Sequence, residues 1–290
     1  MAMIRTAGAW KELLWLALTF FAVASPLPAQ EKIFSGPQPG EKLPPLKVRI
    51  VIGDKAGKEV DILADAKGKP TFLVFMNEWN EEVAELMRVI TLYAEQQEKP
   101  QLASAVVWLT PDPIDLGANL VRSRLNMPRK TPVGVSLDGL EGPGAYGLNR
   151  RVQMTILVAD GNVVTANFAL VQPSVKGDTV AVLSELVKVI GGKPPTLAEV
   201  LSARELQIVT TRIEQMVDES ASDEQVQKLA KVVESFVASR PDAKRKLGQA
   251  SSEIVTSGRF SDRTTAIGYL RKWAKDYEDN RRSIGPNHCR

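Results

Sequence analysis

Apolar positions in residues 46–192 alternate between short strand-like runs and helix-period stripes. A shorter apolar run, 60–63, would continue the first strand after a turn. Helix-period segments begin at Asn80, Asp112 and Asp178, which are good N-cap residues. This alternation predicts an α/β domain with a mostly parallel central sheet. The strand-like runs, rich in apolar, β-branched and aromatic residues and bounded by turn residues, occupy 48–52, 71–76, 105–110, 133–138, 154–158 and 163–170.

The segment 68–83 is the best-defined strand-to-helix unit in the chain. A Gly-Lys-Pro turn leads into the apolar run, and polar residues separate that run from the helix. Asn80 is expected to cap the helix, and Glu81 and Glu82 place negative charge where the N-terminal N–H groups and the helix dipole favour it. One apolar face follows, comprising Val83, Leu86, Met87 and Ile90. The pattern predicts a buried strand that feeds directly into a helix.

From Thr196 onward the pattern is helical throughout. The Gly- and Pro-rich residues 191–195 before it are typical of a domain boundary. Each helix carries an apolar stripe that it cannot bury alone, so the helices are expected to pack together or on the preceding domain. The helix-start signals are Thr196 with Glu199, Ser222 with Gln225, Pro241 and Ser261.

The segment 68–83 resembles the active-site segment of the thioredoxin-like superfamily. The shared features are the Gly-Lys-Pro turn, an apolar strand ending in Phe75, and Trp79 followed by four residues leading into a helix. The resemblance is nearest to the redoxin and alkyl hydroperoxide reductase/thiol-specific antioxidant branch. Members of that branch carry C-x-x-C after the Trp, or a single peroxidatic Cys nearby. Here the four positions are Asn80, Glu81, Glu82 and Val83.

A second part of the chain, residues 144–161, carries the same resemblance. Family members usually show a Tyr-Gly pair, a Val-Pro-Thr segment with a cis-proline, and an apolar strand that ends in Asp-Gly. The pair Tyr146-Gly147 and the turn Asp160-Gly161 match, whereas Gln153 occupies the proline position. A cis bond before a residue other than proline costs about 2.5 to 4 kcal/mol, so we expect a trans peptide there.

The resemblance implies a thioredoxin-like fold, a central mixed sheet flanked by helices, followed by an all-α C-terminal module. The expected segments are a signal peptide (1–29), a linker leading into the domain (30–45), the thioredoxin-like domain (46–192), the helical module (196–280) and a flexible tail (281–290).

The N-terminus has the pattern of a secretory signal. Arg5 and Lys11 precede an apolar run over 13–24 that is short for a membrane span, and small residues offer cleavage after Ala24 or Ala29. We therefore expect a periplasmic or secreted protein with no stable membrane span after cleavage. The alternative is an uncleaved N-terminal anchor.

Few residues in this chain are suited to catalysis. The carboxylates of Glu78, Glu81, Glu82 and Glu85 have no His nearby, so helix capping and a solvated face explain them better than a metal or acid/base site. Histidine-dependent triads and metal sites are not expected, because the single His is His288. No phosphate-binding glycine motif is present, and a formal charge of +3 gives no reason to expect nucleic acid. We expect no metal and no cofactor.

Two functional hypotheses remain. The first is a redox-inactive, exported binding or scaffolding module with a protein partner in the cell envelope, and its candidate groove comprises Trp79, Asn80, Tyr146 and Gln153. Thiol exchange needs a thiolate, which neither Asn80 nor Val83 supplies. The second is a thiol-disulfide oxidoreductase or peroxiredoxin-like enzyme that uses Cys289, the single Cys of the chain. The sequence does not predict the oligomeric state.

Overall fold

The computed structural model describes residues 33–97 and 102–277. The expected signal peptide (1–29), the tail (281–290), His288 and Cys289 lie outside the described residues. Within residues 33–97 and 102–277, no helix combines the length and apolar character needed to cross a membrane.

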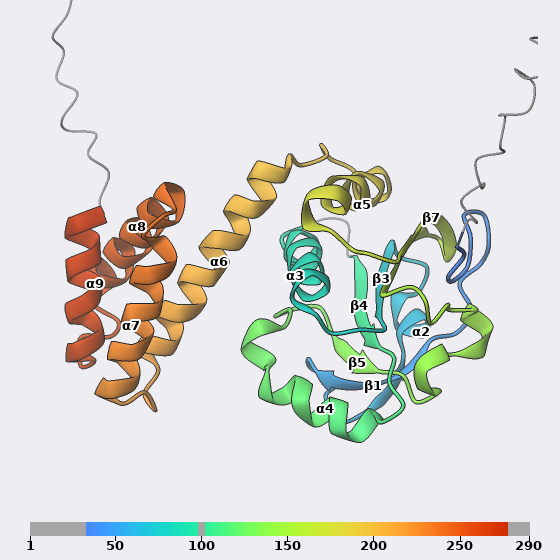
Figure 1. Cartoon of the computed structure of the whole chain (residues 1–290), viewed down its shortest axis with the longest axis horizontal. Coiled ribbons are helices and arrows are strands. Elements are labelled where there is room, and N and C mark those ends of the chain that lie inside the picture. Colours follow the sequence, from blue (N-terminus) through green and yellow to red (C-terminus); the bar gives the residue numbers. More distant parts are fainter. Residues whose placement is uncertain (1–32, 98–101, 278–290) are drawn as a thin grey trace, which may run out of the picture. The chain divides into compact units, whose positions relative to one another are not determined.

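One mixed sheet forms the centre of residues 46–192 (Figure 1). Its strands lie in the order β2-β1-β5-β4-β3-β6-β7, with β3, β4 and β5 parallel and every other neighbouring pair antiparallel. The strands are β1 (Lys47–Ile52), β2 (Glu59–Asp61), β3 (Thr71–Met76), β4 (Ala103–Trp108), β5 (Val133–Val135), β6 (Met154–Asp160) and β7 (Val163–Leu170).

The expectation of a mostly parallel sheet is wrong for this chain. Only β3 to β4 and β4 to β5 are joined by connections that contain an α-helix and return the chain in the same direction. Between β6 and β7, Gly161 and Asn162 both have positive φ, which makes a tight turn and forces the strands to run antiparallel. The mixed sheet implied by the family resemblance is confirmed.

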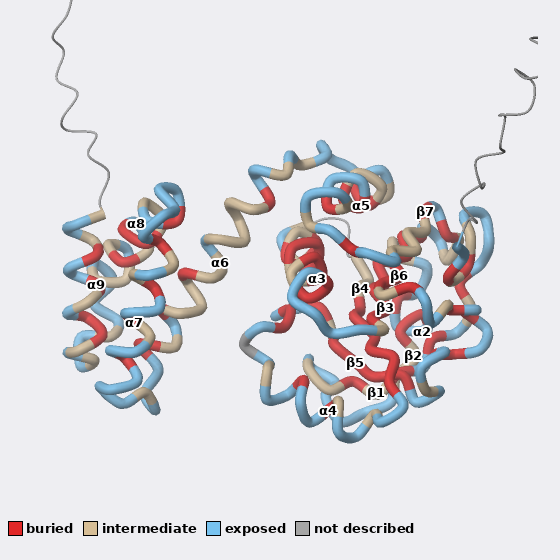
Figure 2. Tube along the Cα trace, viewed as in Figure 1, coloured by how far each residue is buried: buried red, intermediate tan, exposed pale blue. Residues whose placement is uncertain are grey.

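The two faces of the sheet are covered by different helices. Alternate residues of β3 enter two apolar clusters: Phe72, Val74 and Met76 face one, and Leu73 and Phe75 face the other. The first cluster packs against α3 (Glu81–Glu95), α4 (Pro113–Arg122) and α5 (Val175–Ile190), and the second against α2 (Ile62–Ala66). Figure 2 shows the resulting band of buried residues along the central strands.

Three local expectations need correction. The run 60–63 is not one strand, because the Asp61 side chain accepts from the N–H groups of Leu63 and Ala64 and starts α2. Helix α5 is capped by Ser174 instead of Asp178. Asp178 lies one turn further along the helix, and its carboxylate accepts from the Ser174 N–H at 2.7 Å. The last helix begins at Thr264 instead of directly after Ser261, because turn residues extend from the end of the preceding helix to 262.

Four more helices follow α5 in the described part of the chain: α6 (Leu197–Val217), α7 (Asp223–Val237), α8 (Pro241–Ser257) and α9 (Thr264–Tyr277). Both predicted capping boxes are present. The apolar stripes of these helices meet in one cluster that includes the fully buried Trp273, whose indole N–H donates to Glu234 at 3.0 Å. The domain boundary expected at 191–195 stays a prediction.

Candidate functional site

The four positions that follow Trp79 form the cap and first turn of α3. The Asn80 side-chain oxygen accepts from the Val83 N–H at 2.9 Å, and Glu81 and Glu82 lie in the first helical turn. This helix begins after the central strand β3, as the sequence predicts. The Val83 N–H, one of the groups that would favour an anion at this helix N-terminus, is therefore bonded to a neutral amide.

Gln153 lies beside this helix start. Its side-chain oxygen is 3.5 Å from Asn80 Nδ2, and its Nε2 donates to Glu78 Oε2 at 2.8 Å. Its backbone is also paired: the Gln153 N–H donates to the Leu170 carbonyl at 3.0 Å, and its carbonyl accepts from the Asn77 N–H at 2.9 Å. Proline lacks the N–H that makes the bond to Leu170, so this residue adds a backbone bond that the expected proline could not make.

Trp79 presents an aromatic surface at the same place. Its side chain is 47% exposed, and its ring packs on the buried Trp108 with centroids 5.0 Å apart. The Arg88 guanidinium lies 5.9 Å from the Trp79 ring. One face of this indole is thus held by protein while much of the residue remains open to solvent.

Tyr146 does not lie at this surface, so it is not part of the candidate groove predicted from the sequence. The residue is only 2% exposed, its hydroxyl donates to the Pro44 carbonyl at 2.9 Å, and its ring packs on Phe75. It belongs to the apolar cluster that includes α2. Burial, and then the charge of Asp61, raise the pKa of its hydroxyl well above the ordinary range.

A network of ion pairs joins α3 to α6 next to Trp79. Arg88 contacts Glu81 at 3.2 Å and Glu85 at 3.1 Å, and Arg204 of α6 contacts Glu85 through both Nε and Nη2. Burial disfavours the Glu85 carboxylate, but the hydrogen bonds and charges of Arg204 and Arg88 outweigh it and lower the Glu85 pKa. The i,i+3 spacing of Glu85 and Arg88 is visible in the sequence, whereas Arg204 has no sequence signal.

The chemistry available at this surface is hydrogen bonding, ion pairing and aromatic stacking. Across residues 33–97 and 102–277, no three His, Cys, Asp or Glu side chains come together as metal ligands. Asn80 and Val83 cannot attack a disulfide or a peroxide, because neither side chain can form a thiolate.

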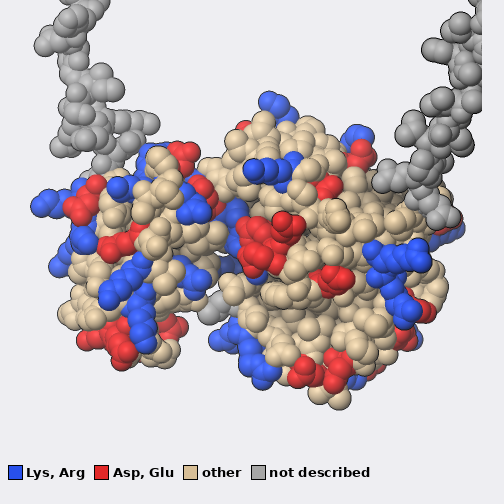
Figure 3. Space-filling view, in the orientation of Figure 1, with Lys and Arg blue, Asp and Glu red and all other residues tan. Residues whose placement is uncertain are grey.

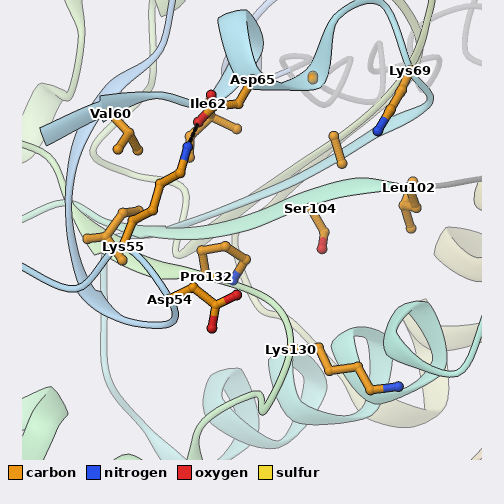
Figure 4. A pocket seen from close by; sticks show the side chains of 13 residues that line it. Asp54, Lys55, Val60, Ile62, Asp65, Lys69, Leu102, Ser104, Lys130 and Pro132 are labelled. Atoms are coloured by element: carbon orange, nitrogen blue, oxygen red, sulfur yellow. Dashed lines mark hydrogen bonds and ion pairs between the residues drawn. The ribbon is translucent and has the colours of Figure 1, made fainter. Parts of the chain in front are cut away.

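A cavity of about 310 Å³ lies elsewhere, lined by residues of β1, β2, α2 and β4. Its apolar floor includes Ile50 and Ile62, and charged side chains form its rim. Lys55 and Asp65 of this rim pair with each other at 2.5 Å, as Figure 4 shows, and Lys130 Nζ donates to the Glu95 carbonyl at 3.3 Å. None of the sequence-predicted site residues lines this cavity.

The sequence matches no protein-family model and no curated protein. Comparison with solved structures finds a candidate thiol:disulfide interchange protein DsbE from Chlorobium tepidum, with 17% identity over 55% of this chain and 100% of the other, and a TM-score of 0.41. It also finds an exposed lipoprotein thioredoxin from Streptococcus pneumoniae, with 18% identity over 50% of this chain and 99% of the other, and a TM-score of 0.38. A peroxiredoxin-like protein from Aquifex aeolicus has 13% identity over 54% of this chain and 91% of the other, and a TM-score of 0.36.

The topology itself defines the fold. Strands β4 and β3 are parallel, β6 and β7 continue the sheet as an antiparallel hairpin, α3 follows β3, and α5 follows β7. Asn80 and Gln153 lie side by side where the sequence resemblance implies a cysteine and a proline. The chain therefore has the thioredoxin-like fold, followed by a set of helices, with no cysteine at the start of α3.

Proposed function

We propose that this protein is a redox-inactive thioredoxin-like binding module. The observation that carries the proposal is the contact at the start of α3, where the Asn80 side chain accepts from the Val83 N–H. In a redox-active domain of this fold, the helix N-terminus stabilises a thiolate. Here the same N-terminus is capped by the Asn80 amide, so this position offers groups for binding and carries no thiol.

The surface around Trp79 is suited to binding an extended segment of a partner protein. A half-exposed indole supported by Trp108 offers a large, rigid contact area, and residues of this type often dominate the energetics of interfaces. The Asn80 and Gln153 amides and the Glu78 carboxylate beside it supply hydrogen-bonding groups for backbone or polar side chains. The expected signal peptide favours a partner in the cell envelope.

Insulin reduction in the presence of dithiothreitol tests the proposal. The full-length protein and its Cys289→Ser variant should give the same rate of insulin precipitation as a blank without protein. A rate above the blank that disappears in Cys289→Ser would instead support the oxidoreductase hypothesis. Peroxide consumption, measured with the same two proteins, should likewise be absent.

A further inference from the structure

A groove runs along α6 and α7 and reaches the edge of α3. It has a volume of about 320 Å³. A second, shallower hollow continues from it along α7, and Val232 and Phe236 line both. We refer to the two together as the α7 groove. In Figure 3, basic side chains lie over α6 and α7, and acidic side chains gather over α3 and at the lower end of α7.

Helix α7 has a second apolar strip besides the one that faces the core. Its core-facing residues are Val226, Ala230, Val233 and Val237. Val232 and Phe236 are four residues apart and therefore lie one above the other on another face. Val232 is 51% exposed, and Phe236 and Ile208 of α6 are half-buried beside it in the groove. Phe236 also packs in part against the core of the helices, so the apolar surface that this strip leaves exposed is mainly that of Val232.

The cations of the α7 groove fall into two groups. Arg88 and Arg204 at its α3 edge are neutralised by Glu81 and Glu85. Three others have no carboxylate partner within the part of the chain that the structure describes: Arg212, Lys231 and Arg240. Arg212 donates to the neutral Gln215 at 2.9 Å, and the Arg240 guanidinium lies 4.5 Å from the Phe236 ring.

We propose that the α7 groove binds an acidic segment of a partner protein that carries a large apolar side chain. The apolar side chain packs on Val232 and Phe236, and flanking carboxylates pair with Arg212, Lys231 and Arg240. Charge complementarity favours an acidic partner. The apolar strip between the cations favours a partner with an apolar side chain over a polyanion that has none. The inference rests on the proposed function, because it gives the binding module a partner of defined chemistry.

Fluorescence anisotropy of short dye-labelled peptides tests this assignment on the full-length protein. The probe has two leucines and a phenylalanine among glutamates. One comparison peptide has lysines in place of the glutamates, and another has serines in place of the apolar residues. The acidic apolar peptide should bind more tightly than both, and its affinity should fall as salt is raised.

Variants locate the binding. Arg212→Glu and Val232→Ser should each weaken binding of the acidic apolar peptide by about tenfold or more. Their matched controls are Arg271→Glu on the exposed face of α9 and Val180→Ser on α5, which lie outside the groove and should leave binding unchanged. Circular dichroism of each variant checks that the helices are retained.

Several results would overturn the assignment. These are no binding of the acidic apolar peptide up to millimolar concentration, equal binding of the lysine peptide, and binding that Arg212→Glu and Val232→Ser leave unchanged. Binding to phosphatidylglycerol vesicles that Arg212→Glu abolishes, without peptide binding, would assign the groove to lipid. None of these outcomes depends on the insulin assay, so failure of this inference is distinguishable from failure of the proposed function.

Discussion

Arg204 of α6 donates two hydrogen bonds to the Glu85 carboxylate of α3, from Nε at 2.9 Å and from Nη2 at 3.1 Å. The side chains are only 14% and 28% exposed, respectively, so solvent screens this pair less than an ordinary surface pair. The contact links α3, the helix that would carry the reactive thiol in an active relative of this fold, to α6, the first of the four C-terminal helices.

Replacing Arg204 should destabilise the protein more than replacing a surface arginine. Arg204→Ala leaves Glu85 with Arg88 alone, and we expect a loss of about 1–2 kcal/mol in the free energy of unfolding. Arg245→Ala is the matched control, because Arg245 pairs with Asp242 at 3.5 Å on the surface of α8. Its expected cost is about 0.5 kcal/mol or less. Urea denaturation measures both, and equal losses would show that the Arg204 contact adds nothing.

The lowered pKa of Glu85 predicts a pH-dependent contribution to stability. Since the folded-state pKa lies below the ordinary value of 4.5, the contribution is fully present above the pKa of the unfolded chain. It is lost as the pH falls through the folded-state pKa. The difference in unfolding free energy between the native protein and Glu85→Gln should therefore be largest near neutral pH and shrink below about pH 4.5. A difference that grows on acidification would contradict this sign.

Two glycines of the C-terminal helices should respond to alanine in opposite directions. A Cβ on Gly248 of α8 would lie 2.6 Å from the Tyr277 carbonyl oxygen, so Gly248→Ala should force α8 and α9 apart and cost about 1–3 kcal/mol. A Cβ on Gly268 of α9 would meet no atom within 4 Å. Gly268→Ala should stabilise its helix by about 0.5–1 kcal/mol. Thermal unfolding compares the two, and a neutral Gly248→Ala would mean that the helices are not packed this closely.

The Asn80 cap should contribute to stability. Asn80→Ala removes the acceptor for the Val83 N–H and should cost about 1 kcal/mol. Asn80→Asp keeps the acceptor and adds a charge that the helix dipole favours, so it should unfold at an equal or higher temperature than the native protein. Differential scanning calorimetry distinguishes the two. Equal unfolding temperatures for the alanine and aspartate variants would rule out a capping role.

Local signals predicted some elements because the residues that decide them are close in sequence. The Asn80 cap and the two capping boxes satisfy N–H groups within three residues, so their sequence patterns are sufficient. The sequence does not distinguish Ser174 from Asp178 as the cap of α5, because both are good cap residues and both bond at that helix start. The burial of Tyr146 depends on Phe75 and Pro44, which are distant in sequence, so the residues next to Tyr146 do not reveal it. Glu85 and Arg204 are 119 residues apart in the sequence, and no local pattern predicts their contact.

The rate of insulin reduction by the native protein and by an Asn80→Cys, Val83→Cys double variant tests the central claim most directly. The two positions are three residues apart at a helix start, where a thiol becomes more acidic and a second thiol can resolve a mixed disulfide. We predict that the native protein matches the blank, and that the double variant, in a Cys289→Ser background, reduces insulin faster than the blank. Reduction by the native protein above the blank would contradict the account.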